Sequence, residues 1–238
     1  MAAYHPHLKE VKNLWKNKKL TAAWVLFAVW LYGAWSVYTL WLLPILQDAL
    51  PNKYMMELVG TGIIKNIVWV LPAFWLIRHF SQELAIPAKE LFSLRREHLK
   101  YLLIAVFLAV LVIAGAIGRR HGFSLSPSFH PSQFIIVLFV GIEEEMVFRG
   151  FFLNGTLIGA DTNFKKGIAV AVNAVMFLFI HFPIWIYNGV FITNFTNFGF
   201  ITILVLSALF SFCTMRCRSL WVAVILHSFY DAMIFLFA

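Results

Sequence analysis

The feature that most constrains this chain is a series of long, continuous apolar runs. A helix needs about 20 residues to cross the hydrocarbon core of a bilayer, and most of the runs approach that length. Their continuity favours helices over the alternating strands of a membrane barrel. We therefore predict an all-α polytopic transmembrane helical bundle of about seven spans. The spans are expected at roughly residues 21–46, 56–77, 100–118, 133–153, 167–187, 198–214 and 219–237.

The composition agrees with a membrane location and limits the classes of partner. Only 13% of the residues are charged, whereas soluble domains carry about 25%. The net charge of +8 would fit a nucleic-acid-binding protein, but the Lys and Arg residues of membrane proteins collect in cytoplasmic loops. We therefore expect membrane lipid and no nucleic acid among the partners, and one membrane domain over residues 1–238.

The basic residues also predict an orientation. Residues 1–20 are basic, and the apolar run after them is too long for the core of a cleaved secretory signal, so we expect a retained first span. Further Lys and Arg residues are concentrated at 78–100, 165–166 and 216–218, which the alternating spans place on the same side. This bias predicts a cytoplasmic N-terminus in the cell membrane and a C-terminus outside. The connection at 79–99 fits either an amphipathic surface helix or a solvated loop.

Seven ionisable side chains lie inside three of the apolar runs. An ionisable side chain in lipid costs about 2.5–3.5 kcal/mol on insertion scales, so such a group is expected to face the bundle interior and to have a function. With a helical rise of about 1.5 Å per residue, Glu144, His181 and His227 lie at depths similar enough for one shared intramembrane site. The seven residues are Glu143, Glu144, Glu145, Arg149, His181, His227 and Asp231.

The spacing of these residues predicts which of them act together. Residues four apart share one face of a helix, so Glu145 is expected to pair with Arg149, and His227 to point the same way as Asp231. Glu144 is rotated by about 100° from its neighbour and points elsewhere. Two adjacent carboxylates therefore occupy different environments, and the one that lines a pocket suits the role of a general base.

Glu143, although it is one of the seven, and two charged residues of the second span are expected to lie outside the chemistry. Glu143 is predicted to turn toward a neighbouring helix or water. Lys65 and Glu57, in the second span, are predicted to snorkel to the membrane interface. The alternative for these two is that they serve as counterions of the site.

Three short motifs in these runs resemble those of the CPBP intramembrane proteases, also called Abi proteins, which include CAAX prenyl endopeptidases and bacteriocin-processing proteins. Glu144–Arg149 matches the EExxxR motif, Phe177–His181 the FxxxH motif and His227–Asp231 the HxxxN/D motif. Each motif is weak alone, but three in order on separate spans are specific together. The resemblance covers about residues 141–232, and we predict a catalytic core at 133–237.

The resemblance implies an intramembrane endopeptidase whose active site opens toward the cytoplasm. By motif, Glu144 would activate the attacking water, and His181 would help to bind or orient it. Glu145 and Arg149 would maintain the architecture of the site. Hydrolysis of a peptide bond needs such a base, together with donors directed at the tetrahedral oxygen. The substrate would be a peptide or protein, either prenylated or carrying a leader.

His227 and the residue at 231 would stabilise the oxyanion in this family. An asparagine at 231 can donate a hydrogen bond to the oxyanion, but an ionised aspartate cannot. Asp231 must therefore be protonated, or orient His227 as a charged donor, or bind a metal.

The sequence does not decide whether the site binds a metal ion. Glu144, His181, His227 and Asp231 are acceptable zinc ligands, and a zinc-bound water is an effective nucleophile. No HExxH pair is present, and the resemblance fits a glutamate-dependent protease as well as a metalloprotease. We expect no tightly bound cofactor, with zinc as the alternative.

Two functions from other classes are also compatible with the pattern. Intramembrane Glu and His residues build proton relays, so a proton-coupled transporter is one alternative. A non-enzymatic bacteriocin immunity or scaffold protein is the other.

Overall fold

The computed structural model describes residues 14–237, apart from the side chain at position 120. This part of the chain consists of helices joined by turns and contains no strand, so the predicted all-α polytopic bundle is confirmed. Of the predicted basic segment 1–20, residues 1–13 lie outside the described residues. The assignment of the whole chain to one membrane domain stays a prediction.

The first half of the chain forms two long helical hairpin arms and a third long helix. Its elements are the 3-10 turn η1 (Leu14–Lys16), α1 (Lys18–Val37), the π-helical η2 (Tyr38–Leu42), α2 (Leu43–Ala49), α3 (Lys53–Glu57), the π-helical η3 (Leu58–Val70), α4 (Leu71–His79), α5 (Ala88–Leu91), the 3-10 helix η4 (Arg96–Leu103) and α6 (Ile104–Arg120). Polar caps mark the helix starts: Asn17 Oδ1 accepts from the Leu20 amide, and Asn52 Oδ1 accepts from the Met55 amide.

The second half contains the acidic and histidine motifs. Its elements are α7 (Gln133–Glu145), the π-helical η5 (Met146–Leu153), α8 (Asn154–Thr156), α9 (Asn163–Phe179), α10 (Phe182–Tyr187), α11 (Phe191–Thr196), α12 (Gly199–Cys217) and α13 (Trp221–Phe237). Pro183 lies in the first turn of α10. Because proline removes a helical hydrogen bond, it accounts for the break between α9 and α10.

Five helices among the described residues are long and apolar enough to cross a membrane. They are Lys18–Ala49, Lys53–His79, Arg96–Arg119, Asn163–Tyr187 and Gly199–Cys217. The predicted spans at 133–153 and 219–237 correspond to α7 with η5 and α8, and to α13. The first of these is helical throughout but carries three glutamates and an arginine, and the second has only 17 residues. Their charge content and length, respectively, set them apart from the five.

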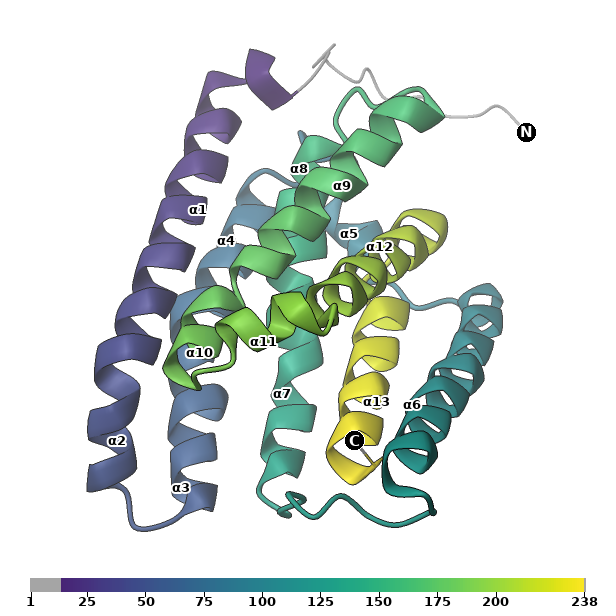
Figure 1. The fold of residues 1–238 in the computed structure, drawn as a ribbon. Coiled ribbons are helices and arrows are strands. Elements are labelled where there is room, and N and C mark those ends of the chain that lie inside the picture. Colours follow the sequence, from purple (N-terminus) through teal and green to yellow (C-terminus); the bar gives the residue numbers. More distant parts are fainter. Residues whose placement is uncertain (1–13, 238) are drawn as a thin grey trace.

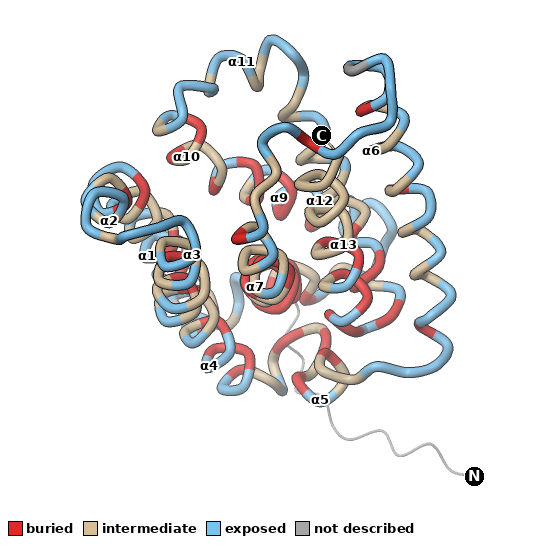
Figure 2. Tube along the Cα trace, turned by 90° about the horizontal axis from the view of Figure 1, so that it is seen from below, coloured by how far each residue is buried: buried red, intermediate tan, exposed pale blue. Residues whose placement is uncertain are grey.

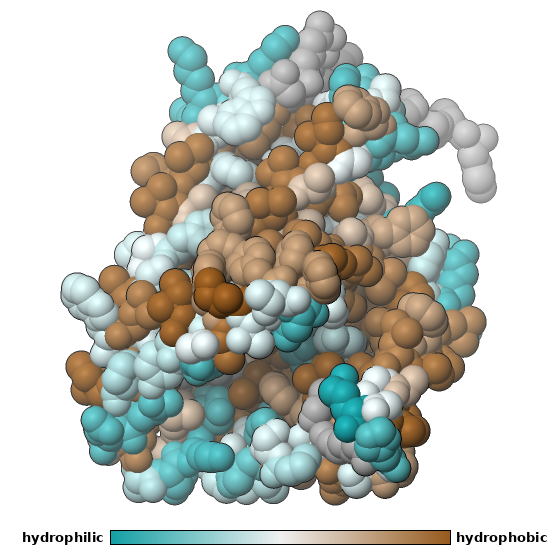
Figure 3. Space-filling view, viewed as in Figure 1, coloured by the Kyte–Doolittle hydropathy of each residue, from teal (hydrophilic) through white to brown (hydrophobic). Residues whose placement is uncertain are grey.

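The bundle surrounds α7. In Figure 1, α1 and α2 run beside α3 and α4 on one side of α7, while α13 and α6 lie on the other. The view from below shows α3, α9, α12 and α13 around α7, with buried residues concentrated there and exposed ones along α1 and α6 (Figure 2). Hydrophobic residues cover most of the middle of the face in Figure 3, and hydrophilic ones lie toward its ends. The charged segment therefore lies inside the bundle, where function is expected of it.

α13 packs closely against α7 because Gly141 has no side chain. A Cβ atom at this position would lie only 2.7 Å from the carbonyl oxygen of Val224. Small residues allow such close approach of membrane helices. The contact brings the acidic segment of α7 against the histidine segment of α13.

Most of the basic residues lie at one end of the bundle, which we call the basic end. There α1, α9 and α13 begin, and α4 and α12 end (Figure 1). Its Lys and Arg residues are Lys16, Lys18, Lys19, Arg78, Lys89, Arg95, Arg96, Lys100, Lys165, Lys166, Arg216 and Arg218. That this end faces the cytoplasm stays a prediction.

The connection at 79–99 is neither a surface helix nor a solvated loop. It forms turns around the short α5, and its apolar residues Leu84, Ile86 and Leu91 are buried in the core. The side chain of Asn154 accepts from the backbone amide of Ile86 at 2.6 Å and donates to the carbonyl of Ile86 at 2.8 Å. The Leu220 amide donates to the carbonyl of Leu91 at 2.9 Å. These hydrogen bonds hold the connection against α8, which follows η5, and against the start of α13.

Candidate active site

The six predicted site residues come from four segments of the chain that meet inside the bundle. Two carboxylates end α7, the arginine follows in η5, one histidine lies at the break between α9 and α10, and the second histidine and last carboxylate lie in α13. In that order they are Glu144, Glu145, Arg149, His181, His227 and Asp231. Ion pairs and a shared cavity connect all six.

Glu145 connects the helices of the site. Its Oε1 atom accepts a hydrogen bond from Nη1 of Arg149 at 3.0 Å, which confirms the predicted pair. The same oxygen lies 2.8 Å from Nδ1 of His227, so that nitrogen is the donor. Nη2 of Arg149 donates to Oγ of Ser207 in α12 at 2.9 Å and to its carbonyl at 3.2 Å. The fully buried glutamate and arginine are thus paired and hydrogen-bonded, as buried charges must be.

Glu144 points in another direction from its neighbour, as the helical rotation predicts. Its Oε1 atom lies 3.5 Å from Nζ of Lys65, and its Oε2 atom lies 3.8 Å from Nε2 of His227. Unlike Glu145, it lines a cavity. Two adjacent carboxylates therefore do occupy different environments.

The backbone fixes the orientation of His181. This residue precedes the first turn of α10, and its Nδ1 atom lies 2.8 Å from the carbonyl oxygen of Phe177. Because a carbonyl oxygen only accepts hydrogen bonds, Nδ1 carries the hydrogen. Nε2 of the neutral ring is then an acceptor, the form that can bind a water hydrogen.

Four of the six residues line one cavity of about 360 Å³. They are Glu144, His181, His227 and Asp231. Aromatic residues, among them Trp185, Phe210 and Tyr230, form much of the remaining wall. Beyond α7, α9 and α13, the lining comes from α10, α11 and mainly the first half of α12, so the cavity extends from the carboxylates toward α11 and away from the basic end. This direction is opposite to the expected opening toward the cytoplasm, which stays a prediction.

Lys65 corrects the sequence interpretation. It was expected to snorkel, but only 7% of it is exposed, and its Nζ atom lies 3.1 Å from Oε2 of Glu143 as well as near Glu144. Nζ also lies 4.6 Å from the ring centre of Trp69. The α7 carboxylates and the aromatic faces attract the ammonium group inward, so the counterion alternative is right for this residue. Glu143 does turn toward a neighbouring helix, where Asn66 Nδ2 donates to its Oε1 at 2.9 Å.

Two contacts of the site were missed from the sequence. Ser207 binds the arginine of η5, and Phe210 stacks on the ring of His227, with centroids 5.0 Å apart. A serine or phenylalanine in an apolar span carries no signal of its own, because both are common packing residues there. Lys65 did carry a signal in the sequence, because a lysine inside an apolar span needs a partner if it is buried.

The four possible zinc ligands do not form a metal cluster in this structure. No group of three or more His, Cys, Asp or Glu side chains within the described range is arranged to hold a metal ion. The expectation of no tightly bound cofactor stays a prediction, and we derive no step through a metal.

The comparisons with known proteins agree with this geometry. Residues 126–233 match the family model described as Type II CAAX prenyl endopeptidase Rce1-like. The resemblance to the CAAX protease family is confirmed. The matched region runs from just before α7 nearly to the end of α13 and contains all six site residues, whereas Lys65 lies outside it. Neither a curated protein nor a solved structure gave a match to the chain.

The match favours a protease over the transporter and immunity alternatives. In general terms, the match supports an integral membrane protease similar to CAAX prenyl endopeptidases, a class whose substrates are peptides or proteins.

Proposed function

We propose that this protein is an intramembrane endopeptidase in which Glu144 activates water for attack on a peptide bond. The observation that carries the proposal is the single cavity shared by Glu144, His181, His227 and Asp231. A base, an acceptor that orients water and a donor for the oxyanion are the parts that peptide hydrolysis requires.

Glu144 takes the proton of the water, and Nε2 of His181 accepts its other hydrogen. The histidine suits this task because its Nδ1 atom is occupied by the Phe177 carbonyl, which leaves Nε2 as the acceptor in the cavity. The carboxylate then transfers the proton to the leaving amine, and the peptide bond breaks.

His227 stabilises the oxyanion. Its Nδ1 atom donates to Glu145, and Nε2 lies 3.7 Å from Oδ2 of Asp231 and 3.8 Å from Glu144. Carboxylates near both ring nitrogens favour a ring that carries a hydrogen on each, so Nε2 can donate to a developing negative charge. In this proposal Asp231 acts by orienting the His227 ring, which is one of the three roles that the sequence leaves open for an aspartate at this position.

Lys65 keeps Glu144 ionised and positioned. Its ammonium group lies between Glu143 and Glu144, so it compensates the charge of the base without touching the other cavity residues. The reaction proceeds on these side chains without a tightly bound metal.

The substrate is a prenylated protein tail of the CAAX type. The family supplies this expectation, and the aromatic wall of Phe177, Trp185 and Phe210 offers an apolar surface beside the carboxylate. A leader peptide is the competing substrate. The basic end faces the cytoplasm of the cell membrane, in accordance with its excess of Lys and Arg.

The first experiment offers purified protein a farnesylated CAAX peptide, its unprenylated form and a leader peptide. Cutting of the farnesylated peptide is expected, with a loss of about 10²-fold or more in Glu144→Gln because the general base is removed. Glu57→Gln, an acid in the neighbouring span outside the cavity, is the matched control and should cut normally. Full activity in Glu144→Gln would refute the mechanism, and cutting of the leader alone would refute the substrate.

A second experiment addresses metal dependence. We expect cutting to persist after treatment with a zinc chelator and dialysis, with the metal content measured in the same sample. Loss of cutting that added zinc restores would contradict the metal-free mechanism.

A third experiment addresses orientation. A cysteine introduced at Lys18 should react with an impermeant thiol reagent only after the cells are opened. Labelling on intact cells would reverse the assigned orientation.

A further inference from the structure

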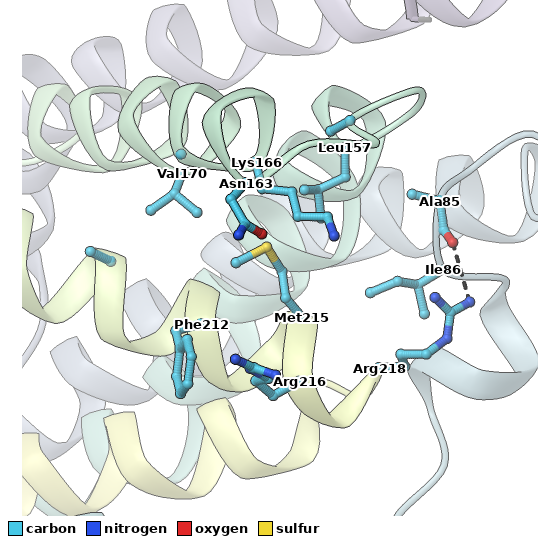
Figure 4. Close-up of a pocket in the computed structure, with 13 residues that line it drawn as sticks. Ala85, Ile86, Leu157, Asn163, Lys166, Val170, Phe212, Met215, Arg216 and Arg218 are labelled. Atoms are coloured by element: carbon cyan, nitrogen blue, oxygen red, sulfur yellow. Dashed lines mark hydrogen bonds between the residues drawn. The ribbon is translucent and has the colours of Figure 1, made fainter. Parts of the chain in front are cut away.

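A second cavity, of about 760 Å³, lies near the basic end between the first turns of α9 and the last turns of α12 (Figure 4). α12 separates it from the candidate active site. Ala208 and Phe212 line this second cavity, whereas Leu206 and Phe210 line the catalytic one. Residues two apart on a helix point to nearly opposite sides. The second cavity is therefore distinct from the site where hydrolysis is proposed.

Cationic side chains border this cavity from two helices. Lys166 reaches into it from α9, and Arg216 lies across from it on α12 (Figure 4). Arg218, just after α12, is compensated by Glu90, whose Oε2 atom lies 2.5 Å from its Nε. None of the described residues that line the cavity is acidic, and neither Lys166 nor Arg216 forms an ion pair with a described residue. Arg216 lies over the ring of Phe212, 5.3 Å from its centre, so no acid compensates the charge of either cation and both can attract an anionic ligand.

The cavity becomes apolar with distance from the helix ends. Val170 lies one turn beyond Lys166 along α9, and Phe212 one turn before Arg216 along α12. Met215 lies between the two helices (Figure 4). Cations near the helix ends with an apolar wall deeper in the bundle repeat the order of headgroup and acyl chain in one leaflet of a bilayer.

We propose that this cavity binds an anionic phospholipid. Lys166 and Arg216 contact the headgroup phosphate, and an acyl chain lies along Val170 and Phe212. Basic pockets between transmembrane helices recognise anionic headgroups in this way. Free phosphate shares the charge of the headgroup but leaves the apolar wall without a partner, so the lipid is the better fit.

Native mass spectrometry of the solubilised full-length protein tests the proposal. The protein is given equal amounts of dioleoylphosphatidylglycerol and dioleoylphosphatidylcholine, and the lipid retained on it is measured. We expect preferential retention of phosphatidylglycerol, which falls several-fold in the double variant Lys166→Gln with Arg216→Gln. The matched control is Lys18→Gln with Lys19→Gln, which removes the same charge from exposed positions of the basic end and should retain the lipid as the wild type does.

Three results would overturn the proposal. They are equal retention of both lipids by the wild type, an equal loss in the control double variant, and displacement of the lipid by an equal concentration of inorganic phosphate. Thermal unfolding of both double variants shows whether they are folded, and all four substituted residues are exposed. The measurement does not require cutting, so it stands or falls separately from the protease mechanism.

Discussion

Charged residues in the centre of the bundle and those at its basic end follow different rules. Glu145 and Arg149 have no exposed surface and share their hydrogen bonds with two further helices. At the basic end, the side chains of Arg218 and Glu90 pair while 50% and 36% exposed, respectively. Water solvates the exposed pair whether or not it forms, so that pair contributes little. Water cannot solvate a buried charge, so each charged side chain in the centre of the bundle needs its partners to compensate it.

The largest effect is expected from Arg149→Met. It leaves Glu145 buried without its cation, which should lower the free energy of unfolding by about 3–5 kcal/mol and abolish cutting. Titration with sodium dodecyl sulfate in mixed micelles measures the stability. Adding Glu145→Leu should restore much of the stability, because the uncompensated charge is gone, but not the cutting, because His227 loses the acceptor at its Nδ1. If Arg149→Met loses less than about 1 kcal/mol of unfolding free energy, the buried Glu145–Arg149 pair contributes no more than an exposed salt bridge does.

Lys65→Met should have the next largest effect. The variant leaves two α7 carboxylates without their cation, but Asn66 still donates to Glu143, so we expect a loss of about 3 kcal/mol. Cutting should fall most at low pH and recover in part as the pH rises, because Glu144 loses the cation that keeps it ionised. Lys53→Met, at an exposed position near the start of the same span, is the control and should change neither quantity. Normal cutting in Lys65→Met would show that the lysine is only structural.

Ser207→Ala should have an intermediate effect. It removes one hydrogen bond to a charged group, while the carbonyl of the same residue still accepts from Arg149, so a loss of about 1.5 kcal/mol is expected. Ser93→Ala, which removes a partly buried hydroxyl outside the site, provides the comparison. If the two variants lose the same free energy of unfolding while only Ser207→Ala slows cutting, the main role of Ser207 is to position the Arg149 guanidinium and not to stabilise the bundle.

Arg218→Gln should have the smallest effect. The pair with Glu90 is exposed, so the stability should change by about 1 kcal/mol or less, and less still at high salt. Measurements at low and high ionic strength separate this screened contribution. If Arg218→Gln lowers the free energy of unfolding as much as Arg149→Met does, and equally at low and high salt, the exposed and buried pairs do not differ in their contribution.

The sequence predicted two contacts of the candidate site because its motifs are local. Glu145 with Arg149, and His227 with Asp231, are four residues apart, so helical geometry alone places each pair on one face. The position of Lys65 could not be derived in this way. Its two carboxylate partners lie on another helix, and only the packing of η3 beside α7 decides that it turns inward and not toward the interface. The connection at 79–99 shows the same limit, because the Asn154 side chain that anchors it comes from a distant segment.

By itself, the sequence determined that this protein is a helical membrane bundle with ionisable residues inside its spans. Long apolar runs require backbone hydrogen bonds inside each segment, and charges within them are too costly to keep without a function. Only the tertiary structure decided which cations and hydroxyls complete the site, and toward which side its cavity extends. Those depend on contacts between helices far apart in the chain, where a missing side chain, as at Gly141, sets how closely two helices approach.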